Sequence, residues 1–190
     1  MNTFLAPKRT TDGDLIVRCY RIEDAQQLMA ATYDSYHHLK RFMPWATTSQ
    51  SLEETQDLIV GFSDAYDANQ DFVFSIWDAD ETHLLGGSGF HLREGPLKSQ
   101  SAEIGLWINK IHAGRGLGRK ALKAIIKWGF TDWPWLRLAW RCNAENIASI
   151  RCAESNDMIR EGTLRHQYNP VDGSRRETAC YSILKHEWTG

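Results

Sequence analysis

The chain has 190 residues, a formal net charge of −2, 42% hydrophobic residues and 24% charged residues. These values are typical of one globular domain and exclude a disordered chain, and the small net charge excludes general electrostatic binding to nucleic acid. We find neither an apolar signal core nor a run long enough to span a bilayer, so we expect a cytoplasmic protein, one domain over 1–190, and no membrane partner. The cysteines lack C-x-x-C spacing, so we expect no metal site and no disulfide framework; they are Cys19, Cys142, Cys152 and Cys180.

The first half of the chain alternates short strands with helices. Alternating hydrophobic residues predict strands over 15–20, 72–77, 84–92 and 102–109, with a hairpin turn over 78–83. A first helix is expected over about 23–32. Ser51 and Glu54 form a capping box that predicts the start of a second helix. The apolar face of that helix holds Leu52, Ile59, Phe62 and Tyr66.

The second half is expected to add a strand–helix–strand–helix unit and a final hairpin. A helix that should end before Pro134 is followed by a strand over 136–142 and a short helix after Asn146. The apolar face of the first of these helices holds Leu117, Ala121, Ile125 and Trp128. The hairpin is predicted over 159–164 and 177–185. Together the elements predict an α/β fold with a mixed, mostly antiparallel sheet and helices on both faces.

A glycine-rich turn lies between the strand over 102–109 and the helix that follows it. Gly114, Gly116 and Gly118 permit positive φ and leave no side chains over the turn. Several backbone N–H groups can therefore converge on an anion at the positive end of the helix. Full positive charges surround the same place, from Arg115, Arg119 and Lys120. The turn predicts a phosphate site, suited to a pyrophosphate.

Two other interpretations of the turn stay open. Gly116-Leu-Gly118-Arg-Lys-Ala121 also fits the G-x-G-x-x-A pattern of dinucleotide-binding folds, which need an acidic residue about 20 positions further on. The next strand supplies Arg141 instead, which suits a 2′-phosphate, and the antiparallel strands upstream argue against that fold. The second alternative is a glycine turn before a basic helix, with no ligand. The strand–turn–helix context and the three cations favour phosphate binding.

At this turn the chain resembles a known family, the GCN5-related N-acetyltransferases, and within it the Rim-type enzymes that acetylate protein N-termini. The resemblance rests on the order and spacing of further blocks: Arg21-Ile-Glu-Asp-Ala, Met43-Pro-Trp45, Ala102-Glu-Ile-Gly-Leu-Trp-Ile108, Asn143-Ala-Glu-Asn146-Ile-Ala-Ser149-Ile-Arg151 and Glu161-Gly-Thr-Leu-Arg165. It implies the same architecture, with the fourth and fifth strands splayed apart to admit the pantetheine arm of acetyl-CoA.

The resemblance also implies where acetyl-CoA binds, with its pyrophosphate on the glycine turn and its pantetheine along the preceding strand. The residues expected to contact it are Trp107, Ile108, Arg115, Gly116, Leu117, Gly118, Arg119, Lys120, Asn143 and Asn146. Ala113 stands where the family usually has Gln or Arg, so one phosphate contact is either missing or supplied by Arg115.

Transfer of an acetyl group from a thioester to an amine requires a proton acceptor, because an amine is mostly protonated near neutral pH. The resemblance makes Glu103 the expected general base, since Rim-type relatives often have a glutamate there facing the substrate channel. Asp71 and Glu161 are weaker substitutes, and Glu103 has the equal alternative of a solvated or ion-paired carboxylate. We expect the amine to attack acetyl-CoA directly in a ternary complex, because no histidine is placed in sequence to activate a cysteine.

The short helix after residue 146 carries the expected leaving-group residue. By resemblance, Ser149 stabilises or protonates the departing thiolate. Asn146 either contacts the pantetheine or only caps the helix. Many relatives use a tyrosine further along, where this chain has Ala153. The family pattern Lys-Leu-Gly-Phe is replaced by Ser155-Asn-Asp-Met158, and Asn and Asp tolerate left-handed backbone, so the helix can still end there.

The aromatic residues bear on the acceptor and on assembly. Most of the eight tryptophans are expected in the core, whereas Trp45 and Trp107 are placed near the acceptor cleft. A protein N-terminus and a small amine, including a flat aromatic one, stay open as acceptors. The tryptophan-rich segment over 128–140 and the tail around Trp188 indicate a homodimer if they are exposed.

Three classes of function remain at this point. The leading one is an acetyl-CoA-dependent N-acetyltransferase. The second is a non-catalytic acyl-CoA-binding domain, favoured by Ala113 and Ala153. The third, a dinucleotide-dependent enzyme, is disfavoured by the missing acidic residue. The identity of the amine stays open, because acceptor loops vary freely around a constant donor site.

Overall fold

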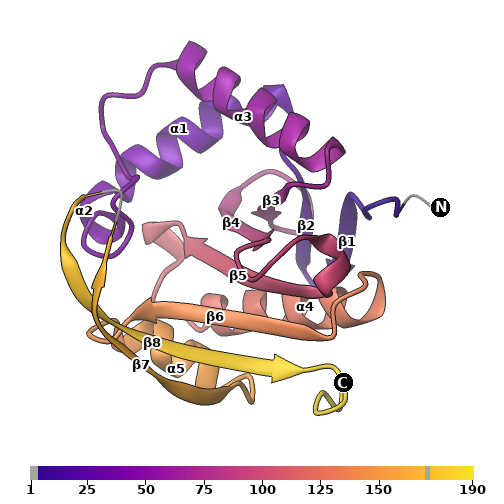
Figure 1. Ribbon diagram of the computed structural model, residues 1–190. Helices are drawn as coiled ribbons and strands as arrows, with labels where there is room; N and C mark the ends of the chain where they lie inside the picture. The colour runs from indigo at the N-terminus through magenta and orange to yellow at the C-terminus, as the bar shows by residue number, and fades with distance from the viewer. Residues whose placement is uncertain (1–3, 170–171) are drawn as a thin grey trace.

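The computed structural model describes residues 4–169 and 172–190, and within them an eight-stranded sheet runs through the molecule (Figure 1). The order across the sheet is β1-β2-β3-β4-β5-β6-β8-β7. The strands are β1 (Arg9–Asp12), β2 (Leu15–Cys19), β3 (Asp71–Trp77), β4 (Leu84–His91), β5 (Ser101–Ile108), β6 (Arg137–Asn143), β7 (Ile159–Tyr168) and β8 (Arg175–Leu184). The helices are α1 (Ala25–Asp34), α2 (Tyr36–Leu39), α3 (Leu52–Asp67), α4 (Leu117–Thr131) and α5 (Ile147–Glu154). Short 3-10 turns are η1 (Ile22–Asp24), η2 (Leu97–Ser99) and η3 (Lys110–His112).

One neighbouring pair of strands is parallel, and it separates along its length. β5 and β6 pair only where 101–103 meet 137–139, although β5 continues to Ile108 and β6 to Asn143. The other neighbouring strands pair in antiparallel fashion. A V-shaped gap therefore opens beyond Glu103. This confirms the expected mixed, mostly antiparallel sheet with a splayed strand pair.

Helices cover both faces of the sheet, as expected: α1 and α3 lie on one face, and α4 and α5 on the other (Figure 1). The alternation of side chains along a strand explains the two layers. In β3, Phe72 and Phe74 enter the large hydrophobic cluster with α4, whereas Trp77 enters a smaller cluster with α1 and α3. Residues of odd number in β3 thus face α1 and α3.

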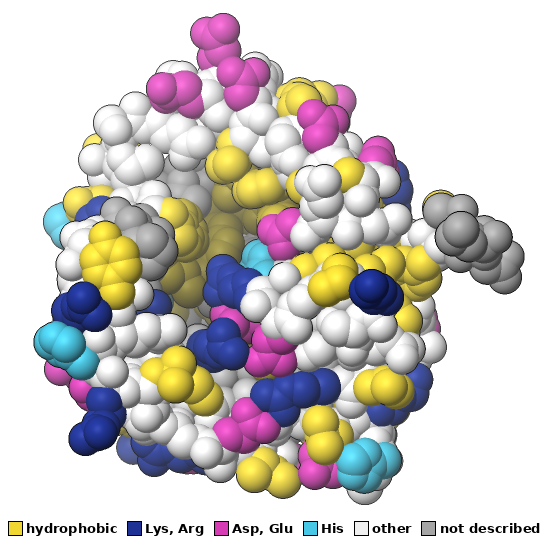
Figure 2. Space-filling model, in the orientation of Figure 1, with side chains coloured by type: hydrophobic (Ala, Val, Ile, Leu, Met, Phe, Trp, Pro, Cys, Tyr) yellow, Lys and Arg dark blue, Asp and Glu magenta, His cyan; other side chains and the backbone are white. Residues whose placement is uncertain are grey.

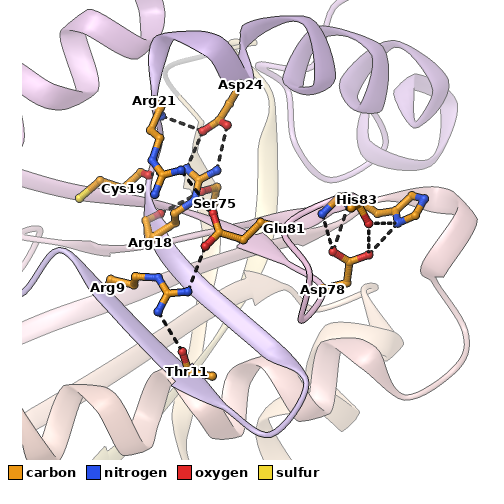
Figure 3. Close-up of polar contacts among 11 residues, drawn as sticks. Arg9, Thr11, Arg18, Cys19, Arg21, Asp24, Ser75, Asp78, Glu81 and His83 are labelled. Atoms are coloured by element: carbon orange, nitrogen blue, oxygen red, sulfur yellow. Dashed lines mark hydrogen bonds and ion pairs between the residues drawn. The ribbon is translucent and has the colours of Figure 1, made fainter.

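The junction between β2 and α1 is fixed by a buried ion pair (Figure 3). Arg18 is 4% exposed, and its two Nη atoms lie 2.7 and 2.9 Å from the carboxylate oxygens of Asp24. Asp24 also accepts a hydrogen bond of 2.7 Å from the backbone N–H of Arg21. A bidentate, charge-assisted pair of this kind fixes direction as well as distance. The block Arg21-Ile-Glu-Asp therefore positions α1 against the sheet.

Two predicted helix ends are confirmed in detail. Ser51 Oγ accepts the Glu54 N–H at 3.1 Å, and Glu54 accepts the Ser51 N–H at 2.6 Å, which is the expected capping box. Asp157 takes φ of 59° after α5, and Met158 is buried, so the altered pattern after this helix preserves the turn. One detail was wrong: Leu52 is 43% exposed and lies off the buried face of α3.

β1 was missed because its sequence, Arg-Thr-Thr-Asp, has no hydrophobic alternation. It is an edge strand whose pairing with β2 comes from backbone hydrogen bonds that side-chain polarity does not report.

The tryptophan-rich segment is core rather than surface. Trp128, Trp133, Trp135 and Trp140 are each at most 5% exposed, and Trp188 lies 5.7 Å from Phe130, ring centre to ring centre. The expected core role of most tryptophans is confirmed. The reason given for a homodimer, exposed aromatic surface on this segment, is therefore wrong, and the dimer itself stays a prediction.

Candidate active site

The glycine turn occupies the mouth of the gap between β5 and β6. Gly114 and Gly116 take φ of 77° and 81°, and a Cβ built on either would meet no atom of the chain within 4 Å. The positive φ requires glycine, and the free space above the turn is available to a ligand. Gly118 follows in the first turn of α4, near Ile108 and Cys152.

The backbone donors of this turn are fewer than the sequence indicated. The N–H of Lys120 already bonds the Gly116 carbonyl at 3.1 Å, so the free donors of the first helical turn are those of 117–119. The Lys120 ammonium is also paired, with Asp14 in the β1–β2 turn. Arg115 and Arg119 are exposed beside the turn. In the first turn of α4 three backbone N–H groups remain, and with the two guanidinium groups they give a donor set that fits a pyrophosphate.

The other expected donor-side residues lie along the two walls of the gap. Trp107 and Ile108 end β5, beyond the last residue paired with β6, and Asn143 ends β6. Asn146 caps α5, because its Oδ1 accepts the Ser149 N–H at 3.1 Å. The capping role is thereby shown, and contact with pantetheine stays a prediction. Leu117 is half-buried against the large cluster and begins α4.

Ser149 receives a hydrogen bond that sets its chemistry. The indole Nε1 of Trp140 donates to Ser149 Oγ at 3.0 Å. An indole N–H can only donate, so the hydroxyl hydrogen must point elsewhere and is available to a further acceptor. Ser149 is thus arranged as a hydrogen-bond donor.

The cysteines near the gap are poor nucleophiles. Burial raises the pKa of Cys142, and it raises the pKa of Cys152 to about 11. The thiolate is the reactive form of cysteine, so these two groups are largely unreactive near neutral pH. Neither residue offers the activated nucleophile that a covalent acetyl-enzyme would need.

Glu103 lies on β5 at the point where the gap begins. Its side chain is 4% exposed, and Oε1 accepts a hydrogen bond from Arg93. Oε2 lies 3.4 Å from Arg141 and has no hydrogen-bond partner among the described residues. Figure 2 shows a hollow on this side of the molecule, with hydrophobic side chains on its walls and charged side chains gathered at its edge. Glu103 is therefore an ion-paired carboxylate with one oxygen free to accept.

The two weaker candidates for the base have other partners. Glu161 binds Arg137 through both oxygens at 2.6 and 2.7 Å, and this pairing lowers the pKa of Glu161 to about 2. A carboxylate so strongly stabilised is a poor base near neutral pH. Asp71 accepts a hydrogen bond from Nδ1 of His91 at 2.8 Å. His91 was not singled out from the sequence, because it comes 20 residues after Asp71 and only the antiparallel register of β3 and β4 joins them.

Trp45 and Trp107 meet edge to face with ring centres 6.3 Å apart, and Trp45 is 49% exposed. Near them the end of β6 and the segment after α2 border a cavity of about 440 Å³. Its lining includes Arg41, Phe42, Asn143 and Arg175. His37 and His38 of α2 are exposed. Among the described residues, no three His, Cys, Asp or Glu side chains are grouped to hold a metal ion.

A splayed strand pair, a glycine turn with free N–H donors, a hydroxyl donor on α5 and a buried carboxylate on β5 fit a transferase that uses an acyl-CoA donor. A model of the family described as "Acetyltransferase (GNAT) domain" matches residues 14–159, and the chain belongs to this family. It is an N-acetyltransferase, with acetyl-CoA as the donor and an amine as the acceptor. The alternatives of a non-catalytic domain and a dinucleotide-dependent enzyme are set aside.

Relatives in sequence agree with this assignment, and a solved structure shares the fold. The chain is 31% identical over 127 residues to the ribosomal-protein-serine acetyltransferase of Escherichia coli (strain K12), covering 67% of this chain and 69% of the relative. It is 28% identical over 176 residues to N-acetyltransferase p20 of Bacillus licheniformis, an uncharacterized protein, covering 93% and 96%. The crystal structure of the microcin C7 self-immunity acetyltransferase MccE with acetyl-CoA and AMP superposes with a TM-score of 0.80 at 16% identity, covering 91% and 93%. In the described residues, no helix is long and apolar enough to cross a membrane.

Proposed function

We propose that this enzyme acetylates the N-terminal α-amine of a protein, with ribosomal proteins as the first candidates. The observation that carries the proposal is the free oxygen of Glu103, buried beside the gap where β5 and β6 part. An amine or ammonium nitrogen suits this oxygen, because its N–H groups donate and a carboxylate accepts. The Escherichia coli relative, named for acetylation of a serine in a ribosomal protein, supports a peptide acceptor.

On the donor side, the N–H groups of 117–119 and the guanidinium groups of Arg115 and Arg119 hold the pyrophosphate. Trp107, Ile108, Asn143 and Asn146 border the path of the pantetheine, with Gly116 and Gly118 keeping the turn clear. Acetyl-CoA supplies an activated thioester carbonyl. Ser149 then donates its hydroxyl hydrogen to the sulfur as the C–S bond breaks, because Trp140 already donates to its oxygen; the neighbouring Cys142 sulfur is the other acceptor within reach of this hydroxyl.

The amine attacks the thioester carbonyl carbon directly, within a complex of enzyme and both substrates. The high thiol pKa of Cys142 and Cys152 disfavours an acetyl-cysteine step. Initial-rate kinetics with varied acetyl-CoA and amine should give intersecting double-reciprocal lines. Parallel lines, or an acetylated cysteine found by mass spectrometry after a short exposure to acetyl-CoA, would contradict direct attack.

The acceptor is tested with matched peptides. A peptide with a free N-terminal serine is compared with the same peptide carrying a blocked N-terminus and one internal lysine, alongside polyamines and aromatic amines. Acetylation of the free peptide at the α-nitrogen, located by fragmentation mass spectrometry, supports the proposal. Acetylation of the lysine alone, or turnover of small amines without peptides, contradicts it.

A flat aromatic amine is the second candidate acceptor. The contact of Trp45 with Trp107 favours it, because an aromatic pair at a cleft provides a stacking surface. The Trp45→Leu variant separates the two candidates: it should raise the KM of an aromatic amine strongly, and that of a serine peptide little.

We also propose that the enzyme works in the cytoplasm, without nucleic-acid partners, and forms a homodimer. With the tryptophans buried, the support for a dimer comes from β7, a ten-residue edge strand whose residues are nearly all exposed. An unpaired strand edge is a surface that a second copy can cover. Sedimentation of a monomer at micromolar concentration would contradict the dimer.

A further inference from the structure

The sheet face beneath α1 and α3 has a floor of glycines beside the gap. Gly89 of β4 lies directly opposite Gly105 of β5, and the next pair on the same face, towards the start of β5, is His91 with Glu103. A Cβ on Gly105 would come within 2.6 Å of Nε2 of His91, and one on Gly89 within 2.9 Å of its Cε1. The imidazole therefore lies over both glycines, in space that a side chain at either position would occupy.

Asp71 fixes the hydrogen of this imidazole. The pair His91–Asp71 joins neighbouring strands in register, with Nδ1 and Oδ1 2.8 Å apart. A carboxylate accepts hydrogen bonds, so Nδ1 carries the hydrogen and Nε2 presents its lone pair. Among the described residues, no hydrogen bond to Nε2 is formed. Nε2 lies above Gly105, between Glu103 and Trp107 along β5.

Glu103 is well placed to hold an amine and poorly arranged to take its proton. It is shared between Arg93 and Arg141, and a proton on the carboxylate would weaken both ion pairs. Among the described residues His91 has no cationic partner, and its one hydrogen-bond partner is the carboxylate of Asp71. His91 and Glu103 are paired neighbours on the adjacent strands β4 and β5, and their side chains lie on the same face of the sheet. The nitrogen of a single acceptor amine can therefore reach both.

From this arrangement we infer that His91, positioned by Asp71, is the group that takes the proton of the acceptor amine, while Glu103 binds and orients that amine. The inference rests on the proposed direct attack. As the nitrogen lone pair forms the new C–N bond, one N–H proton moves to Nε2 of His91. The electron pair of the C–S bond leaves with sulfur, which takes the hydroxyl proton of Ser149. Solvent removes the proton from His91 and restores that of Ser149, so a neutral amine and a thioester become an amide and a thiol.

The test compares single variants with any amine that the native enzyme acetylates, whether peptide or small molecule. His91→Ala should lower kcat by about 10²-fold, the usual effect of losing a general base, with the Kd of acetyl-CoA in calorimetry unchanged. Free imidazole at millimolar concentration should restore part of the loss, because it can enter the space above the two glycines. Asp71→Asn should lower kcat less, and Glu103→Gln should mainly raise the KM of the amine. His186→Ala, at an exposed position after β8, is the matched control and should change nothing.

Two results would overturn the inference. One is a kcat for His91→Ala within about threefold of native while Glu103→Gln loses about 10²-fold, which would make Glu103 the base. The other needs no acceptor: ¹⁵N spectra of histidine-labelled native enzyme with acetyl-CoA, assigned through His91→Ala, would show hydrogen on Nε2 rather than Nδ1. If peptides fail as acceptors and small amines are turned over, only the proposed acceptor is lost, and both measurements still decide the role of His91.

Discussion

The donor side and the acceptor side of the gap differ in the kind of group that would contact the ligand. The donor side that we propose consists of consecutive residues, a glycine turn and the first turn of α4, and the ligand contacts proposed for it come mainly from backbone N–H groups. The acceptor side that we propose brings together side chains from three strands, with Asp71, His91 and Glu103 spread over more than thirty positions. One side depends on backbone shape, and the other on hydrogen-bonded side chains.

This difference explains how the two sides can diverge. A backbone site tolerates changes in side chains as long as glycine keeps its φ, which is consistent with Ala113 standing where the family usually has a polar residue. A side-chain site changes with single substitutions on any of its strands. We therefore expect the donor side to fail through backbone shape, and the acceptor side through the loss of individual groups.

The largest effect is expected where backbone shape is altered. Gly116→Val should weaken acetyl-CoA binding by about 10²-fold, since it places a branched side chain over the turn and disfavours the φ of 81°. The strain should cost only about 1–2 kcal/mol of the free energy of unfolding, because no atom of the chain opposes the new side chain. Calorimetric titration and urea unfolding measure the two quantities.

The matched control is Gly13→Val in the β1–β2 turn, which also has positive φ, 60°, and open space around it. It should lose similar stability and keep its affinity for acetyl-CoA. If folded Gly116→Val and native enzyme bind acetyl-CoA with equal affinity, the pyrophosphate does not bind at this turn.

The next largest effect concerns the one side chain of α5 that we place at the reaction. Ser149→Ala should lower kcat by about 10- to 100-fold, the value of a hydrogen bond to a developing charge, and leave the KM of the amine unchanged. Raising the pH should restore little, because the missing group acts on sulfur rather than on the amine. A variant whose defect disappears at pH 9 would place Ser149 on the acceptor side instead.

The same contrast governs what the sequence could predict. The glycine turn, the capping box at Ser51 and the helix after Asn146 were predicted because each signal lies within a few consecutive residues. The pairs His91–Asp71 and Glu103–Arg93 were not predicted, since strand register determines them. β1 escaped detection because its polar residues carry no hydrophobic period. The absence of a hydrogen bond at Oε2 of Glu103 could not be predicted either, because it depends on where the structure places Arg141 of β6, 3.4 Å away.

A smaller effect is expected for Trp140, which contacts Ser149 and is not proposed to contact substrate. Trp140→Phe removes the N–H that occupies Ser149 Oγ and keeps most of the buried aromatic volume. The hydroxyl can then turn its hydrogen elsewhere, so kcat should fall by about 3- to 10-fold, the value of one neutral hydrogen bond. In the Ser149→Ala background the same change should have no further effect on kcat. Additive losses in the double variant would show that Trp140 acts only through packing.

The smallest effect is expected for Glu161, because we expect its charge to stabilise the fold rather than to act on substrate. Glu161 bridges β7 to Arg137 of β6 at the base of the gap, and this pairing lowers its pKa to about 2 from an ordinary 4.5. A carboxylate with a lowered pKa in the folded state stabilises the fold above about pH 4.5, and this contribution is lost as the pH falls towards 2.

Because the Glu161 side chain is 42% exposed, solvent limits the contribution to about 1 kcal/mol or less. Glu161→Gln should therefore lower the free energy of unfolding slightly at pH 7, approach the stability of the native enzyme only near pH 2, and keep kcat within about twofold. The exposed Glu23→Gln variant controls for the loss of one negative charge. A large fall in kcat for Glu161→Gln, with stability unchanged, would show that Glu161 takes part in the reaction rather than only stabilising the fold.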